Sequence, residues 1–168
     1  MTISVRPAEL ADVPGLARVH VESWRETYRG QFSDEILDDP TFIERREQFW
    51  TNVLTSKRIS ANGRVAAAVL DGEIVGVALA APFDGDPAWD QYLWALYTYE
   101  SIHEQGAGSA LLAAVIDFDR PAALYVADPN PRARTFYRKH GFQPDGTFKV
   151  EDGVREIRMT RTPAATKH

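Results

Sequence analysis

The sequence of 168 residues contains no cysteine, and this absence removes several kinds of chemistry at once. Without thiols the chain has no disulfide framework, no thiolate zinc site and no cysteine nucleophile. A reaction that passes through a covalent intermediate on a cysteine is therefore excluded. We also expect no bound metal.

Two further absences bear on location and partners. No apolar run approaches the length of a membrane span, and the first residues lack the pattern of a signal peptide, so we expect a cytoplasmic protein without a membrane partner. The net charge of −5 argues against a general nucleic-acid binder, because a polyanion would not be attracted at long range. Length and composition predict one globular domain over residues 1–161, followed by a disordered tail over 162–168.

A glycine turn between an apolar strand and an apolar helix is the most informative feature. Residues 92–99 are rich in apolar and aromatic side chains, Gly106-Ala107-Gly108 follows, and an apolar helix is expected over residues 109–118. Such a turn directs backbone N–H groups and a helix N-terminus at a phosphate. By itself the turn also fits a plain connection. It lacks the Gly-Lys-Ser/Thr ending of a P-loop and the third glycine of a dinucleotide fingerprint.

A second segment, residues 130–142, carries unusually complete helix signals. Asn130 suits the N-cap, Pro131 the first helical position, and Gly141 the position after the end. One face carries apolar and aromatic side chains, and the remaining positions are basic. That basic face is either solvated or in contact with phosphates. The residues concerned are Ala133, Phe136, Tyr137 and His140 on the first face, and Arg132, Arg134, Arg138 and Lys139 on the second.

Together these segments resemble the GNAT superfamily of N-acetyltransferases. In that family, a strand ending in Leu-Tyr-Val leads to a Gln/Arg-x-x-Gly-x-Gly/Ala loop that holds the pyrophosphate of acetyl-CoA. A later Asn-x-x-Ala-x-x-Phe-Tyr-x-x-x-Gly-Phe helix flanks the cofactor and supplies a tyrosine. Leu96-Tyr97-Thr98, residues 103–108 and residues 130–142 occupy the matching places.

The resemblance implies an N-acetyltransferase that transfers an acetyl group from acetyl-CoA, as co-substrate, to a primary amine of a small molecule or peptide. The amine would attack the thioester directly in a ternary complex, in keeping with the absence of a cysteine nucleophile. Tyr137 would protonate the departing thiolate, although a tyrosine on an apolar helix face is usually part of the core. Trp24, Tyr28 and Tyr92 are candidates for the acceptor site. The implied contacts to acetyl-CoA are Leu96, Tyr97, Thr98, His103, Glu104, Gln105, Gly106, Ala107, Gly108, Ser109, Asn130, Arg132, Ala133 and Phe136.

The sequence departs from the family pattern at two positions. His103 stands where Gln or Arg is usual, and Tyr92 stands where some relatives carry a glutamate that acts as general base. The base therefore stays open among Glu26, Glu100, Asp90, His20 and Tyr28. These departures leave room for an alternative, an acyl-CoA-binding sensor or interaction module without transfer activity. Family habit makes a homodimer one expected assembly.

The expected fold is a single-domain α/β (α+β) arrangement. The order of helical and strand patterns implies a mixed sheet with helices on both faces. The resemblance makes this sheet mostly antiparallel, with about seven strands and about four flanking helices. Asp71-Gly72 predicts a tight hairpin turn between two strands, and Thr41 with Glu44 predicts a capping box at a helix start.

Overall fold

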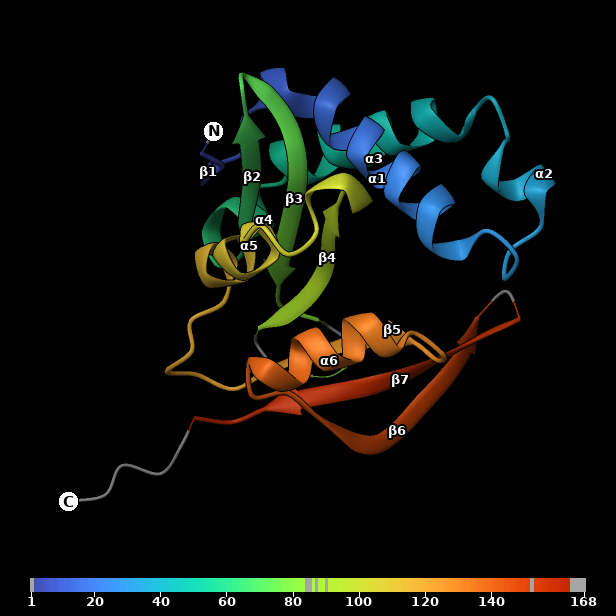
Figure 1. Cartoon of the computed structure of the whole chain (residues 1–168). Coiled ribbons are helices and arrows are strands. Elements are labelled where there is room, and N and C mark those ends of the chain that lie inside the picture. The colour runs from blue at the N-terminus through green and yellow to red at the C-terminus, as the bar shows by residue number, and fades with distance from the viewer. Residues whose placement is uncertain (1, 84–85, 87, 90, 152, 164–168) are drawn as a thin grey trace. The chain divides into compact units, whose positions relative to one another are not determined.

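The structure, a computed structural model, describes residues 2–83, 86, 88–89, 91–151 and 153–163 (Figure 1). These residues form seven strands, six α-helices and two short 3-10 helices. They divide into two compact units, residues 1–80 with 95–115, and residues 81–94 with 116–168. The expected single domain over 1–161 stays a prediction. Of the expected disordered tail, residues 164–168 lie outside the described residues, as does Asp90.

The first unit contains strands β1 to β3 and the end of β4. β1 (Ser4–Pro7) pairs antiparallel with β2 (Arg64–Leu70), and β2 pairs antiparallel with β3 (Glu73–Ala81). The apolar pattern of β2 and β3 buries their central residues, because both faces of these strands are covered. The helical elements of this unit are η1 (Leu10–Asp12), α1 (Val13–Tyr28), α2 (Asp34–Leu37), α3 (Phe42–Thr55), α4 (Lys57–Asn62), η2 (Glu100–Ile102) and α5 (Ala107–Val115).

Neighbouring side chains near the end of β4 (Tyr92–Thr98) point to opposite faces of the sheet, as the strand period of two requires. Tyr97 stacks on His20 of α1, with 4.4 Å between ring centroids. Thr98 lies on the face of α5, where a β-carbon added at Gly76 would meet Leu111 at 2.9 Å and Thr98 at 3.1 Å. In the first unit, α1 and α5 therefore cover different faces of the strands. Helices α1 and α3 pack against each other.

The second unit is built on β4, β5, β7 and β6. The start of β4 pairs parallel with β5 (Ala122–Ala127), placing Leu93 opposite Leu124. β5 pairs antiparallel with β7 (Val154–Arg161), which in turn pairs with β6 (Gln143–Glu151). Helix α6 (Pro131–Lys139) follows β5. The sheet order is β1-β2-β3-β4-β5-β7-β6. This mixed, mostly antiparallel sheet confirms the predicted fold class. The described residues form six α-helices where about four were expected. The two shortest of the six are α2 and α4.

Local signals predicted most element ends correctly. The side-chain oxygen of Asn130 accepts from the N–H of Ala133 at 3.3 Å, and Gly141 has φ +88°. Asp71 and Gly72 both have positive φ, as their hairpin turn requires. The capping box at Thr41 was wrong. The Thr41 hydroxyl donates to Asp39 at 2.8 Å, and no side-chain cap bond forms at this end of α3.

Candidate active site

The loop between β4 and α5, predicted to bind phosphate, turns sharply twice. Glu104 (φ +70°) and Gly106 (φ +86°) adopt left-handed conformations, which glycine takes without strain. A β-carbon added at Gly106 would meet no atom within 4 Å, so the space beside this turn is open. The carbonyl of Gly106 accepts from the N–H of Ala110 at 3.0 Å, which begins the hydrogen-bond ladder of α5.

Three consecutive N–H groups are the donors that this turn presents. Within the described chain, the N–H groups of Gly106–Gly108 donate to no backbone oxygen, as expected at a helix start. The N–H groups of His103 and Gln105 are used inside the loop, donating to the carbonyls of Glu100 (3.1 Å) and Ile102 (3.3 Å). His103 and Gln105 therefore do not offer a backbone N–H to a ligand, and Gly106–Gly108 form a run of N–H groups with the positive end of the α5 dipole behind them.

Glu26 on α1 holds the segment that leads into this loop. Its two carboxylate oxygens lie 3.2 and 3.4 Å from the backbone nitrogen of Glu100, which donates to them. Partial burial raises the pKa of Glu26. Gln105 donates its side-chain amide to the carbonyl of Ser101 at 3.3 Å, which closes the loop on itself. Glu26, one of the open candidates for the base, is therefore engaged in positioning the start of η2.

Trp24 and Tyr28, two predicted acceptor residues, belong to an aromatic cluster of the first unit. Their ring centroids lie 4.9 Å apart. The ring of Phe32 lies 5.5 Å from that of Trp24 and 5.3 Å from that of Tyr28. One turn earlier on α1, His20 lies 6.0 Å from Trp24 and stacks on Tyr97. The cluster thus connects the predicted acceptor residues with β4, the strand predicted to contact acetyl-CoA.

His20 is a core histidine. Its side chain is 3% exposed, and its Nδ1 accepts from the indole N–H of Trp50 at 3.1 Å. Burial and, to a smaller extent, the nearby cation of Arg46 together lower the pKa of His20 to about 3. An imidazole with so low a pKa binds a proton weakly, so it is a poor general base near pH 7.

Tyr92, the third predicted acceptor residue, lies in the second unit. It is buried against the rings of Phe83 (5.0 Å), Trp94 (5.6 Å) and Tyr125 (6.1 Å). Burial raises the pKa of its hydroxyl, with a further contribution from Tyr125. Tyr92 is therefore packed among aromatic rings. It does not take the place of the glutamate that acts as general base at this position in some relatives.

Helix α6 has the two faces that its sequence predicted. Tyr137 is buried, between the rings of Phe136 (5.3 Å) and Phe142 (5.9 Å). The basic face is mainly solvent-exposed at Arg132, Arg138 and Lys139. The fourth basic residue, Arg134, is partly buried and pairs with Asp128, with 3.4 Å between Nη1 and Oδ1. The segment therefore combines a buried tyrosine with an exposed basic surface.

Arg46 on α3 was not among the predicted site residues. Its guanidinium lies over the rings of Phe42 (5.4 Å) and Phe49 (5.8 Å), and its Nε is buried without a hydrogen-bond partner. One sequence signal pointed to it, since Arg46 lies four residues after Phe42 and three before Phe49, on the apolar side of its helix. Periodicity alone does not show that the cation lacks an anionic partner.

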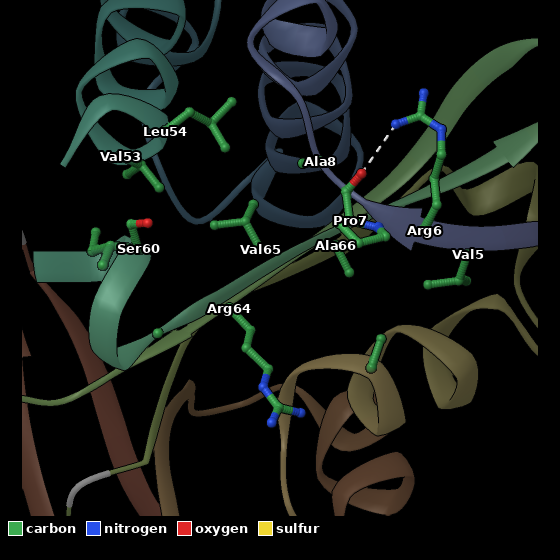
Figure 2. A pocket seen from close by; sticks show the side chains of 13 residues that line it. Val5, Arg6, Pro7, Ala8, Val53, Leu54, Ser60, Arg64, Val65 and Ala66 are labelled. Atoms are coloured by element: carbon green, nitrogen blue, oxygen red, sulfur yellow. Dashed lines mark hydrogen bonds between the residues drawn. The ribbon is translucent and has the colours of Figure 1, made fainter. Parts of the chain in front are cut away.

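A cavity of about 490 Å³ lies elsewhere in the first unit, between β1 and β2 on one side and α3 and α4 on the other (Figure 2). Arg6, one of its lining residues, pairs with Asp12 at 2.7 Å and is not available to a ligand as a free cation. The lining is otherwise mostly apolar and brings together none of the predicted site residues. It consists of Val5, Arg6, Pro7, Ala8, Val53, Leu54, Ile59, Ser60, Gly63, Arg64, Val65, Ala66 and Ala114.

The family model described as "Acetyltransferase (GNAT) family" matches residues 21–142. This match covers more than half of the chain. The chain belongs to the GNAT acetyltransferase family. The residues predicted to contact acetyl-CoA or the acceptor, together with Tyr137, all fall inside the matched segment, whereas His20, a candidate for the base, lies just before it.

Two similar proteins are named as N-acetyltransferases. The Bacillus subtilis (strain 168) protein "Uncharacterized N-acetyltransferase YuaI" is 32% identical over 117 residues, which span 69% of this chain and 64% of that protein. The Mycobacterium tuberculosis protein "Probable N-acetyltransferase Rv2775" is 28% identical over 159 residues, spanning 90% and 88% of the two chains.

A solved structure of another N-acetyltransferase has the same fold. The PaiA N-acetyltransferase of Thermoplasma acidophilum, determined in complex with coenzyme A, has a TM-score of 0.75 and 21% identity over 96% of this chain and 99% of that one. Within the described residues of this GNAT chain, no group of three or more histidine, aspartate or glutamate side chains is placed to hold a metal ion. In the same part of the chain, no helix is long and apolar enough to cross a membrane.

Proposed function

We propose that this chain transfers the acetyl group of acetyl-CoA to a primary amine, which attacks the thioester directly. The family assignment supports acetyl transfer, and both relatives are named as N-acetyltransferases. The observation that carries the proposal is the start of α5, where Gly106–Gly108 present three N–H groups without backbone acceptors. Donors of this kind at a helix N-terminus fit the pyrophosphate of a coenzyme A substrate.

The remaining contacts follow from the family motif. The backbone of Leu96-Tyr97-Thr98 would pair with the amides of the pantetheine arm, and residues 103–109 would surround the pyrophosphate. The start of α6 would flank the cofactor through Asn130, Arg132, Ala133 and Phe136. Acetyl-CoA is a co-substrate in this reaction, and the proposed mechanism uses no metal.

The chemistry requires a neutral amine and a proton for the leaving group. An ammonium ion has no lone pair, so the amine must lose a proton before it attacks the thioester carbonyl. The new C–N bond forms a tetrahedral intermediate, whose nitrogen then releases one proton to solvent, and the C–S bond breaks with its electron pair on sulfur. Tyr137 would donate its hydroxyl proton to that sulfur as a general acid and take a proton back from solvent. Much of the rate gain would come from positioning the two substrates.

Neither His20 nor Glu26 is placed as a strong base for the amine. His20 has a lowered pKa and an engaged Nδ1, and the Glu26 carboxylate accepts from the backbone of Glu100. Deprotonation by solvent, with an amine that enters partly neutral, is compatible with these constraints. This route makes turnover rise with pH toward the pKa of the acceptor amine.

Calorimetric titration with acetyl-CoA tests the proposal first, with ATP and NAD as controls. Saturable binding of acetyl-CoA alone supports the site at Gly106–Gly108. An amine screen that follows release of free coenzyme A then tests transfer. Binding of acetyl-CoA without turnover of any amine would favour the alternative of a sensor, and absence of binding at millimolar ligand would refute both.

A further inference from the structure

Arg46 is a half-buried cation without an anionic partner in the described chain. Its planar group is held over Phe42 and Phe49, and the buried Nε donates to no acceptor. No carboxylate in the described residues forms an ion pair or hydrogen bond with it. Burying an unpaired charge is unfavourable, and the lowered pKa of Arg46 has burial as its main cause.

The other partly buried arginines of the described chain are all engaged. Arg25 and Arg158 pair with carboxylates at 2.8 and 2.6 Å, and Arg134 pairs with Asp128 at 3.4 Å. Arg161 donates to two backbone carbonyls, at 2.7 and 3.0 Å. Arg134 also has a buried Nε without a partner, but its guanidinium pairs with Asp128 through Nη1. Arg46 therefore differs from the other partly buried arginines because its guanidinium has no carboxylate or carbonyl partner among the described residues.

Arg46 and the proposed pyrophosphate donors at Gly106–Gly108 are associated with opposite faces of β4. Arg46 acts electrostatically on His20 and Tyr97, the two rings that stack on the α1 face of β4. Thr98, the next residue, lies on the opposite face with Leu111 of α5. Because α5 begins at the proposed pyrophosphate donors, the anion that suits Arg46 is a different one from the coenzyme A pyrophosphate.

We propose that Arg46 binds a carboxylate of the acceptor, so that the substrate is an amino acid or another primary amine that carries a carboxylate. This inference rests on the proposed acetyl transfer. A guanidinium stacked on aromatic rings keeps its edge for in-plane hydrogen bonds, and a carboxylate matches that edge with two parallel N–H···O contacts. A carboxylate bound to this guanidinium supplies the anionic partner that the described residues do not provide.

The aromatic residues nearby fit the rest of such a substrate. His20 connects the α3 residues Phe49 and Trp50 with Trp24 and Tyr97, at centroid distances between 4.4 and 6.0 Å. His20 and Trp50 are buried, whereas Trp24, Phe49 and Tyr97 are partly exposed. The partly exposed rings would provide apolar contact for carbon atoms between the amine and the carboxylate. They provide no second cation, so recognition of the anionic group depends on Arg46.

The first test compares substrates that differ only in the carboxylate. Wild-type protein receives acetyl-CoA and, in turn, each common L-amino acid, its carboxamide and the corresponding decarboxylated amine. We expect the carboxylate form to have the highest kcat/KM, by roughly tenfold to a hundredfold, because it forms charge-assisted hydrogen bonds. Preference for carboxamides or for polyamines would overturn the proposal.

Arg46→Gln and Arg45→Gln form a matched pair. Arg45 also lies over Phe42, at 5.5 Å, but it is exposed and pairs with Asp39 at 3.6 Å. Arg46→Gln should remove the preference by raising KM for the carboxylate form only, and Arg45→Gln should keep it. Arg46→Lys should restore part of it through its charge. Equal loss for all acceptors in Arg46→Gln would mean a structural role and would contradict the proposal.

A binding measurement separates this inference from the proposed reaction. The Nε–H signal of Arg46, assigned by its disappearance in Arg46→Lys, is followed by ¹⁵N NMR during titration with phenylacetate and with phenylacetamide. A saturable shift with phenylacetate alone supports the carboxylate site even if acetyl-CoA does not bind. No shift with phenylacetate, or weaker acetyl-CoA binding in Arg46→Gln, would refute the inference and leave the proposed reaction standing.

Discussion

Trp50 on α3 donates its indole N–H to Nδ1 of His20 on α1, with 3.1 Å between the two nitrogens. The bond requires a neutral imidazole with its proton on Nε2, because a protonated ring has no acceptor. It also joins two helices that pack against each other, and it satisfies two polar atoms inside the aromatic cluster. Protonation of His20 would therefore break this hydrogen bond and weaken the packing of α1 against α3.

This contact predicts a loss of stability in acid. The pKa of His20 is lowered from 6.5 to about 3, with the rings of Trp50 and Tyr97 and the cation of Arg46 facing the imidazole. The unfolded chain therefore binds the proton first as the pH falls. The free energy of unfolding should decrease below pH 6.5, by about 2 kcal/mol at pH 5 and more toward pH 3.

Urea unfolding at pH 7.5, 6 and 5 measures this effect. His20→Gln keeps an acceptor for Trp50 but cannot be protonated in this range, so its pH dependence should be flatter than that of the wild type. Identical pH profiles for the two proteins would show that His20 does not control acid stability.

The close packing around Gly76, in the same unit, predicts that a larger residue there destabilises the protein. A β-carbon there would lie 2.9 Å from Leu111, 3.1 Å from Thr98 and 3.2 Å from Ala68. Gly76→Ala should lower the free energy of unfolding by about 1–3 kcal/mol, the usual cost of overpacking. Leu111→Ala removes the closest neighbouring atom. In the double variant, the cost of Gly76→Ala should therefore fall. Additive costs for the two substitutions, measured by urea unfolding, would contradict this packing.

The sequence correctly predicted those helix ends and turns whose signals depend only on neighbouring residues. Asn130, Gly141 and the Asp71-Gly72 turn act on their immediate neighbours, and all three behave as predicted. The short helix α4 was missed although Ser56 caps it, accepting from the N–H of Ile59 at 3.2 Å. Six residues are too few for a periodic pattern.

Long-range partners account for what the sequence did not show. Thr41 resembles a capping residue, yet its hydroxyl donates to Asp39 instead. The glycine turn was predicted, but only the folded loop shows that the N–H of His103 is used by Glu100. The absence of an acceptor for Arg46 depends on every side chain around it, so no local motif encodes it.

Gly106→Ala and Gly72→Ala test the proposed pyrophosphate donors. Both glycines have positive φ (+86° and +80°), and an added β-carbon would meet nothing within 4 Å at either. Each variant should lose a similar stability, about 1–2 kcal/mol, from backbone strain. Gly106→Ala alone should also weaken acetyl-CoA binding, by about tenfold for each 1.4 kcal/mol lost in hydrogen bonding. Calorimetry measures both dissociation constants, and equal affinities would argue against donors at residues 106–108.

Tyr137→Phe tests the proposed general acid. The ring lies between Phe136 and Phe142, and phenylalanine keeps those contacts, so stability should change little. Loss of a general acid typically costs about a hundredfold or more in rate, and kcat should fall accordingly while the Kd for acetyl-CoA stays unchanged. Tyr125→Phe is the control, since it removes a hydroxyl from β5 of the same unit without a proposed role. An unchanged kcat in Tyr137→Phe would assign this residue to the core, and an equal loss in both variants would mean that hydroxyl removal perturbs the unit as a whole.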